Sequence, residues 1–309
     1  YFVKRGSEVL VACSDSEKLN LKNSLTYKIN FPKTIVEFFN PFNYFKIFIQ
    51  IKKLVKKNSS DIYYLHTPLA SHLFRFFNYF NKIKIIYFVH GFRFTLQTNK
   101  WKNFFFKIIE KILSYKTNIF ITINNHDFNY AKSNLIKKAS CYKINGVGLH
   151  IPSSYFKNKI RNKKEIKKIL VIAAYKKDKG YLEILKVAEM LQGQKIKIEC
   201  YGYGNYFKYN SIKIRKNLNN IFFNNFDINL KNKIKNFDIL LHLSKREGLP
   251  VAIMQSLTEG LPVICYNIRG NNDLIKNKFN GYFVKSYKDV PNKIHYLNLE
   301  VGLFNKMRH

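Results

Sequence analysis

A strand, a loop, a helix and a second strand follow one another between residues 238 and 266, and this pattern constrains the fold more than any other. The first strand is almost entirely apolar, and the loop after it ends in Glu247 and Gly248. Pro250 stands in the first turn of the next helix and Gly260 just past its end, as is common at helix starts and stops. The segment therefore predicts a βαβ unit with two parallel strands.

The loop of this unit carries the first candidate site residues. In doubly wound sheets, ligands bind beyond the carboxyl ends of the strands, where helix amino termini hold phosphate groups. Here that position carries the carboxylate of Glu247 and then Gly248, which allows the backbone to approach a ligand. The polar side chain of Gln255 follows eight residues after Glu247. We therefore expect a ligand site at this loop.

Short β-branched and aromatic runs alternate with helical patterns along the whole chain, which is typical of parallel α/β sheets. A polar stretch from Ser153 to Lys168 divides them into two series. We predict two doubly wound, Rossmann-like domains that face a cleft, one over residues 1–155 and the other over residues 156–309. The expected strands are 8–12, 61–66, 83–89, 119–124 and 141–145, followed by 169–173, 195–201, 221–224, 238–243 and 262–266.

Both ends of the chain are expected to be truncated. Residues 1–5 have the pattern of a helix end that Gly6 closes, so a first strand is expected before them. The last residues stop without an obvious final helix. We therefore expect the amino-terminal domain to lack its first strand and the carboxyl-terminal domain to lack its end.

The segment around Glu247 resembles the signature of family 4 glycosyltransferases, which are retaining enzymes of the GT-B fold that use nucleotide sugars. That signature has two glutamates eight residues apart around a Gly-Leu/Phe-Pro sequence, and here the second is Gln255. The resemblance implies that residues 1–155 form the acceptor-side domain and residues 156–309 the nucleotide-sugar-binding domain. It implies that Glu247 holds hydroxyl groups of the donor sugar. It also implies that the backbone amides around Gly248 and Leu249 face the sugar and the phosphates, and that Gln255 stands where the ribose is bound.

Further motifs resemble a subgroup of this family that assembles capsule, O-antigen or exopolysaccharide. They are His66-Thr67-Pro68, His90-Gly91-Phe92-Arg93-Phe94, Glu110-Lys111 and Thr122-Ile123-Asn124. The resemblance implies that His90 lies against the donor sugar near the reacting carbon and stabilises the transition state. Arg93 stands in place of the second histidine of the subgroup pattern.

The diphosphate site departs most from the family pattern. Lys179 and Gly180 are kept, but Ala174 stands where relatives carry an arginine. The resemblance implies that Lys179 acts as a point charge on the phosphates, without the bidentate geometry of arginine. Gly202 and Gly204 match a Gly-x-Gly near the nucleotide, although a tight turn after a strand needs glycine anyway.

The function we expect is transfer of a sugar, from UDP-hexose or UDP-N-acetylhexosamine, onto a lipid-linked or polysaccharide acceptor. Neither a cofactor nor a metal ion is implied. The alternative is a degenerate GT-B partner subunit that binds or activates another glycosyltransferase, because Gln255, Ala174, Arg93 and His150 all depart from the pattern. Binding of UDP would discriminate between the two.

The net charge of +35 has two explanations. One is a coding bias that favours Lys, Asn and Ile throughout; the other is attraction to an anionic surface. Because the charge is spread out and no nucleic-acid-binding module is recognisable, we expect a membrane rather than nucleic acid as partner. Two basic amphipathic helices, 43–57 and 99–116, either pack on the sheet or dock on a bilayer, and the second is the better docking candidate.

The expected location is the cytoplasm, peripheral at the inner face of the cell membrane. Four cysteines are scattered without a CxxC spacing, which fits a reducing compartment. No apolar run approaches the roughly 20 residues of a membrane-spanning helix.

Overall fold

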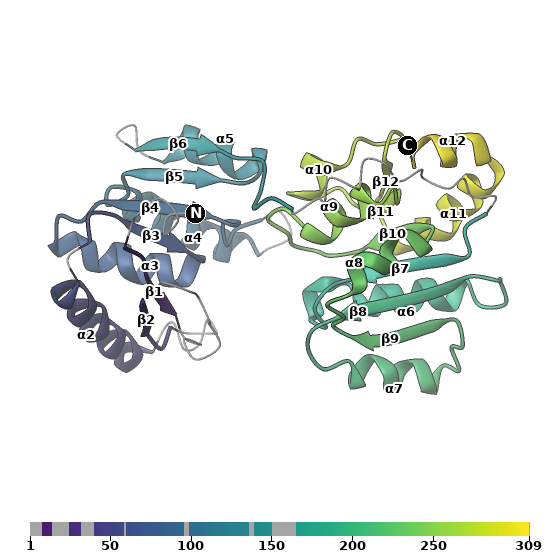
Figure 1. The fold of residues 1–309 in the computed structure, drawn as a ribbon, viewed down its shortest axis with the longest axis horizontal. Coiled ribbons are helices and arrows are strands. Elements are labelled where there is room, and N and C mark those ends of the chain that lie inside the picture. Colours follow the sequence, from purple (N-terminus) through teal and green to yellow (C-terminus); the bar gives the residue numbers. More distant parts are fainter. Residues whose placement is uncertain are drawn as a thin grey trace. The chain divides into compact units, whose positions relative to one another are not determined.

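The computed structural model describes residues 8–13, 25–31, 40–58, 60–95, 99–135, 139–149 and 165–308. The chain forms two compact units, the first of residues 1–123 and 127–144 and the second of residues 124–126 and 145–309 (Figure 1). The predicted boundary at 155/156 lies outside the described residues and stays a prediction. The expected helix end at 1–5 lies outside them too.

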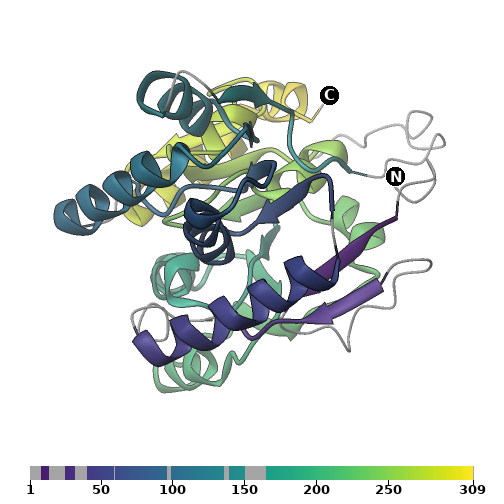
Figure 2. The same cartoon turned by 90° about the vertical axis from the view of Figure 1, so that its left-hand side faces the viewer.

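The first unit contains a four-stranded parallel sheet in the order β3-β4-β5-β6 and a separate parallel pair, β1 and β2. Figure 2 shows this pair in purple, with α2 in the foreground. The strands are β1 (Leu10–Cys13), β2 (Leu25–Lys28), β3 (Tyr63–His66), β4 (Ile85–Val89), β5 (Ile119–Thr122) and β6 (Ser140–Lys143). The helices are α2 (Pro41–Lys57), α3 (Pro68–Phe77), α4 (Lys100–Ser114) and α5 (Asn125–Asn134).

The second unit is a six-stranded parallel sheet in the order β12-β11-β10-β7-β8-β9. Its strands are β7 (Lys168–Ile172), β8 (Lys197–Gly202), β9 (Ile221–Asn225), β10 (Ile239–His242), β11 (Val263–Tyr266) and β12 (Gly281–Val284). Its helices are α6 (Tyr181–Met190), α7 (Phe207–Arg215), α8 (Leu230–Lys233), α9 (Val251–Thr258), α10 (Asn271–Leu274), α11 (Val290–Leu299) and α12 (Val301–Lys306).

Alternate residues of the central strands of the second unit enter two different cores. Ile169 and Ile239 pack with α6 and α11 on one face, whereas Leu170 and Leu240 pack with α8 and α9 on the other. Side chains of a strand alternate between faces, so helices cover both faces of this sheet. The predicted doubly wound architecture is confirmed for this unit.

All ten predicted strands are present with shifted ends, and β2 and β12 are additional to the prediction. The predicted helices 43–57 and 99–116 correspond to α2 and α4. Every helix in the described part of the chain is too short or too polar to cross a membrane.

A buried charged network joins α3, α4 and β4 in the first unit. Glu110 Oε1 lies 2.7 Å from His72 Nε2, and Glu110 Oε2 accepts a 2.8 Å hydrogen bond from Arg75 Nη2. The Arg75 guanidinium lies 4.4 Å from the centre of the Tyr87 ring, and all four residues are at most 2% exposed. Burial alone would raise the pKa of Glu110, but Arg75 and His72 outweigh it and lower that pKa to about 2.

We predict that Glu110→Ala lowers the free energy of unfolding by about 3–5 kcal/mol, because it leaves the Arg75 charge buried without a counter-ion. Urea denaturation at neutral pH measures this loss. The neighbouring exposed residue provides the control, since Lys111→Ala should change stability by less than about 0.5 kcal/mol. Equal effects of the two variants would contradict the assignment.

The contacts of Glu110 with Arg75 and His72 also determine how the stability of the fold depends on pH. The folded-state pKa of Glu110 lies below its ordinary value of about 4.3. The stabilisation by ionised Glu110 is therefore complete above about pH 4.3 and is lost as the pH falls through about 2.

Candidate functional site

The strand order of the second unit reverses between β7 and β10. These two strands are neighbours in the sheet, while β8 and β9 extend it on one side and β11 and β12 on the other. Such a switch point, at the carboxyl ends of the strands, is where open α/β sheets bind their ligands. The loops that follow β7 and β10 carry Lys179 and Glu247, two of the predicted site residues.

The structure brings Lys179 and Glu247 into direct contact. Lys179 Nζ donates a 2.5 Å hydrogen bond to Glu247 Oε1, and the two side chains are 20% and 13% exposed. Arg269 Nε donates to the backbone oxygen of Glu247 at 2.9 Å. The carboxylate is therefore held in one place while part of it stays accessible.

Backbone contacts hold the two loops together. The backbone nitrogen of Lys245 donates to the carbonyl oxygen of Asp178 at 2.8 Å. Ser244 Oγ donates to the carbonyl oxygen of Asp178 at 3.4 Å. Gly180 has φ +77°, and a Cβ there would lie 2.1 Å from the Leu243 oxygen, so this close approach needs glycine.

His242 is a site residue that the sequence analysis did not identify. It ends β10, is 4% exposed, and its Nε2 atom lies 3.3 Å from Glu247 Oε1. This nitrogen has no hydrogen-bond partner within the described part of the chain. A polar residue at the end of an otherwise apolar strand is the signal that could have identified it. Arg269, whose Nε donates to the backbone of Glu247, was also missed.

The environment keeps Glu247 ionised. Burial alone would raise its pKa, but the adjacent His242 and Lys179 outweigh this effect and lower the pKa to about 2. An ionised carboxylate only accepts hydrogen bonds. At neutral pH Glu247 can therefore bind hydroxyl groups but cannot donate a proton.

The remaining predicted residues of this unit lie around the same sheet edge. Gly248 and Leu249 are half-buried in the loop before α9, and a Cβ on Gly270 would lie 2.3 Å from the Gly248 oxygen. Gln255 is half-buried on α9, and its backbone oxygen accepts a bond from Thr258 Oγ1. These positions are compatible with the predicted roles of the three residues, which stay predictions.

Different backbone features explain Gly202, the last residue of β8, and Gly204, two residues beyond it. A Cβ on Gly202 would lie 1.8 Å from the carbonyl oxygen of Ala173, so glycine is needed for the strands to approach. Gly204 is exposed and has φ +100°. Backbone packing therefore explains Gly202 on its own, and its contact with a nucleotide stays a prediction.

The last predicted residue, His90, lies in the first unit directly after β4. It is half-buried, and its Nε2 atom lies 2.9 Å from Nδ1 of His66. Burial lowers the pKa of His90.

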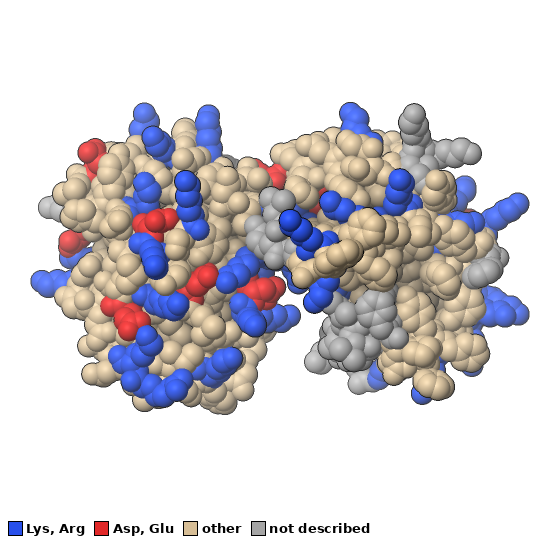
Figure 3. Space-filling model, turned by 180° about the vertical axis from the view of Figure 1, so that it is seen from behind, with Lys and Arg blue, Asp and Glu red and all other residues tan. Residues whose placement is uncertain are grey.

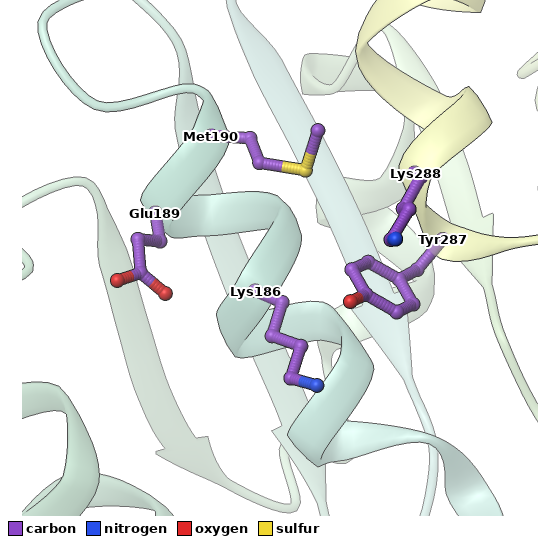
Figure 4. Close-up of a pocket in the computed structure, with 5 residues that line it drawn as sticks. All are labelled: Lys186, Glu189, Met190, Tyr287 and Lys288. Carbon is purple, nitrogen blue, oxygen red and sulfur yellow. The ribbon is translucent and has the colours of Figure 1, made fainter.

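No cluster of three or more His, Cys, Asp or Glu side chains suited to a metal ion occurs in the described ranges. A surface pocket of the second unit lies between α6 and the short helix η7 (Tyr287–Asp289) (Figure 4). Its lining contains none of the predicted site residues and consists of Lys186, Glu189, Met190, Tyr287 and Lys288.

Two family models match the chain, one to each half. A model described as Glycosyl transferase 4-like matches residues 1–124, and one described as Glycosyl transferases group 1 matches residues 154–299.

Two curated relatives share 27% identity with the chain over 259 residues. The first is an uncharacterized 41.2 kDa protein in the cps region of Klebsiella pneumoniae, with 80% of this chain and 71% of that protein covered. The second is UDP-Gal:alpha-D-GlcNAc-diphosphoundecaprenol alpha-1,3-galactosyltransferase of Escherichia coli, with 78% and 66% covered.

Among solved structures, a TarM mutant from S. aureus in complex with fondaparinux, alpha-GlcNAc-glycerol and UDP superposes with a TM-score of 0.67 at 19% identity. The match covers 85% of this chain but only 54% of TarM, so the chain spans about half the length of that protein. At this identity the likeness shows the fold alone, which is GT-B.

We predict that Gly202→Ala lowers the free energy of unfolding by about 1–3 kcal/mol, because its Cβ would collide with the Ala173 carbonyl. Thermal denaturation measures the loss. Gly302 on α12 is the matched control, since a Cβ there meets nothing within 4 Å. Gly302→Ala should be neutral or stabilise by up to about 1 kcal/mol. A neutral Gly202→Ala would show that backbone approach does not explain this glycine.

Proposed function

Because the chain belongs to the family 4-like glycosyltransferases of the GT-B fold, we propose that it transfers a sugar from a nucleotide sugar onto an acceptor during surface polysaccharide assembly. The observation that carries the proposal is the contact between Lys179 and Glu247 at the switch point of the second unit. This contact puts an acceptor for hydroxyl groups beside a donor for phosphate oxygens.

Glu247 binds the donor sugar in this proposal. Its carboxylate accepts hydrogen bonds from sugar hydroxyls, and these charge-assisted bonds are stronger than neutral ones. The buried His242 Nε2 lies 3.3 Å from Glu247 Oε1 and helps to keep this carboxylate ionised.

Lys179 binds the diphosphate. An ammonium group has three donors. Glu247 Oε1 takes one, and the backbone oxygen of Arg246 lies 3.4 Å away, so a phosphate oxygen can take the third. With Ala174 in place of the arginine of the family, stabilisation of the leaving nucleoside diphosphate depends mainly on Lys179.

We propose the reaction that the family resemblance implies. The acceptor hydroxyl attacks the anomeric carbon from the face that the leaving diphosphate departs, and a diphosphate oxygen takes the hydroxyl proton, so the configuration is retained. In this proposal His90 contacts the sugar near the reacting carbon and stabilises the transition state. The protein contributes orientation and charge stabilisation, and no side chain has to form a covalent bond.

The substrates are proposed from the names of similar proteins. The E. coli relative is named for UDP-Gal and a diphosphoundecaprenol-linked acceptor, and the TarM structure contains UDP. We propose a UDP-hexose or UDP-N-acetylhexosamine as donor and a lipid-linked or glycan acceptor.

The proposal is tested by substitution of Glu247. Because the carboxylate holds sugar hydroxyls, Glu247→Gln should reduce kcat/KM by about 10–100-fold, the worth of hydrogen bonds to a charged group. Sugar transfer from a panel of UDP-sugars to membrane lipid extracts measures this. Glu189→Gln, which changes an exposed carboxylate paired with Lys216, should leave the rate unchanged. An unchanged rate in Glu247→Gln would remove the role given to this residue.

The competing function is a degenerate partner subunit, favoured by Gln255, Ala174 and Arg93. Isothermal calorimetry with UDP and UDP-sugars separates the two functions. A folded chain without affinity for any of these ligands would favour the partner role.

We also propose that α4 places the protein on an anionic membrane surface, at the inner face of the cell membrane. The buried side of α4 carries Phe106, Glu110 and Leu113. The opposite side exposes large apolar residues to solvent, with Trp101 81% exposed. They are Trp101, Phe104, Phe105, Ile108 and Ile112.

Lysines border this apolar stripe of α4 on both sides. Successive helix residues turn by about 100°, which places Lys100, Lys107 and Lys111 along one edge of the stripe and Lys102 along the other. Apolar rings that enter the boundary between headgroups and acyl chains, with cations at their edges, are typical of helices that lie on anionic bilayers. Lys and Arg side chains are also spread over the visible faces of both units (Figure 3).

Substitutions in α4 test this surface. We expect Trp101→Ala combined with Phe104→Ala to weaken binding to vesicles of phosphatidylglycerol and phosphatidylcholine by about 10-fold or more, since both rings would leave the interface. Vesicle co-sedimentation measures the loss, and binding should fall with added salt. Helix α2 is the matched control, because its Phe42 and Phe45 are also exposed. A loss of binding in the α2 variant alone would contradict the assignment to α4.

A further inference from the structure

Four aromatic rings cluster at the carboxyl ends of β3 and β4 in the first unit. Tyr64, His66 and Phe88 belong to these strands, and His90 follows β4. The His66 ring stacks on Phe88, with centroids 5.2 Å apart and an angle of 27° between the planes. The centroids of Phe88 and His90 are 4.6 Å apart. The two histidines therefore stand side by side on an aromatic base.

This cluster lies on the sheet face opposite the core of the unit. Leu65, Tyr87 and Val89 enter that core. Residues alternate between faces along a strand, so His66 and Phe88 point to the other side. The two histidines are thus outside the packed interior, where a ligand can reach them.

The histidine pair shares one hydrogen bond. Nδ1 of His66 lies 2.9 Å from Nε2 of His90, so one of these atoms must carry a hydrogen and the other must not. Burial lowers the pKa of both rings, and the nearby His90 lowers that of His66 further. Both rings are therefore favoured in the neutral form, and Nε2 of His90 is already occupied.

We propose that His66 is a positioning residue for His90, a role that rests on the proposed function. His66 donates from Nδ1 to Nε2 of His90, which fixes the ring and the tautomer of His90. The remaining nitrogen of His90, Nδ1, then carries a hydrogen and donates it to an oxygen of the bound sugar. Histidines whose second nitrogen is held in this way keep one tautomer and one orientation.

The backbone conformation next to His66 supports a functional role for this part of the sheet. Thr67 has φ +65° and ψ 137°, a conformation that is costly for a β-branched residue. Pro68 restricts the ψ of the residue before it, so Thr67 cannot relax into a helical conformation. Strained residues of this kind cluster at active sites and ligand-binding regions.

Kinetics of His66 variants test the positioning role. His66→Ala should lower kcat about 10–100-fold with little change in KM for the donor, because the sugar still binds but His90 loses its fixed tautomer. His66→Asn should retain kcat within a few-fold, since its side-chain amide can donate at the position of Nδ1. The control is His295→Ala, an exposed histidine of the second unit. Equal kcat values for His66→Ala and wild type would overturn the role.

A measurement without substrate separates this inference from the proposed function. Long-range ¹H–¹⁵N correlation spectra report which ring nitrogen of each histidine carries the hydrogen. We expect His90 in wild type to carry it on Nδ1, the less common form in free histidine, and to revert to Nε2 in His66→Ala. A hydrogen on Nε2 of His90 in wild type would overturn the proposal. A wild-type protein without transfer activity would count against the proposed function, while the spectra would still decide the pairing.

Discussion

The contact between the Lys179 ammonium and the Glu247 carboxylate joins two loops that lie 68 positions apart in the sequence. It exists because β7 and β10 are neighbours in the sheet, so the loops that leave them meet at one edge. A backbone hydrogen bond from Lys245 to Asp178 also links the same two loops. The proposed binding of a sugar and a diphosphate needs both charges at fixed positions, and the sheet order provides such positions.

Much of the fold followed from local signals. Helix α9 and strands β10 and β11 were predicted because Pro250, Gly260 and two apolar runs mark their ends. Strand β2 was missed because Leu25–Lys28 is short and mostly exposed, and β12 because its first residue is a glycine after an asparagine, which is typical of a turn. Local pattern does not distinguish such strands from loops, since only pairing with a neighbour defines them.

The candidate site was predictable in part. Lys179, Glu247 and His90 were predicted from motifs, but the motifs did not show that Lys179 and Glu247 touch. His242 and the neighbourhood of Arg269 came only from the structure, because both depend on contacts between segments that are distant in sequence. Helix α4 was predicted from the sequence, but its buried and exposed sides were not. The sequence showed one broad aromatic cluster, and only packing separated the buried Phe106 from the exposed Trp101.

The buried Glu110 has a consequence for the direction in which α4 faces. Large apolar residues lie both on the buried side of this helix and on the opposite, exposed side, so burial of hydrophobic area alone does not decide which of the two sides faces the core. Glu110 meets Arg75 and His72 at a single angle and depth, whereas apolar surfaces can slide over one another. The buried ion pair thus fixes the rotation of α4 about its own axis, and thereby determines which of its aromatic rings are exposed to the surroundings.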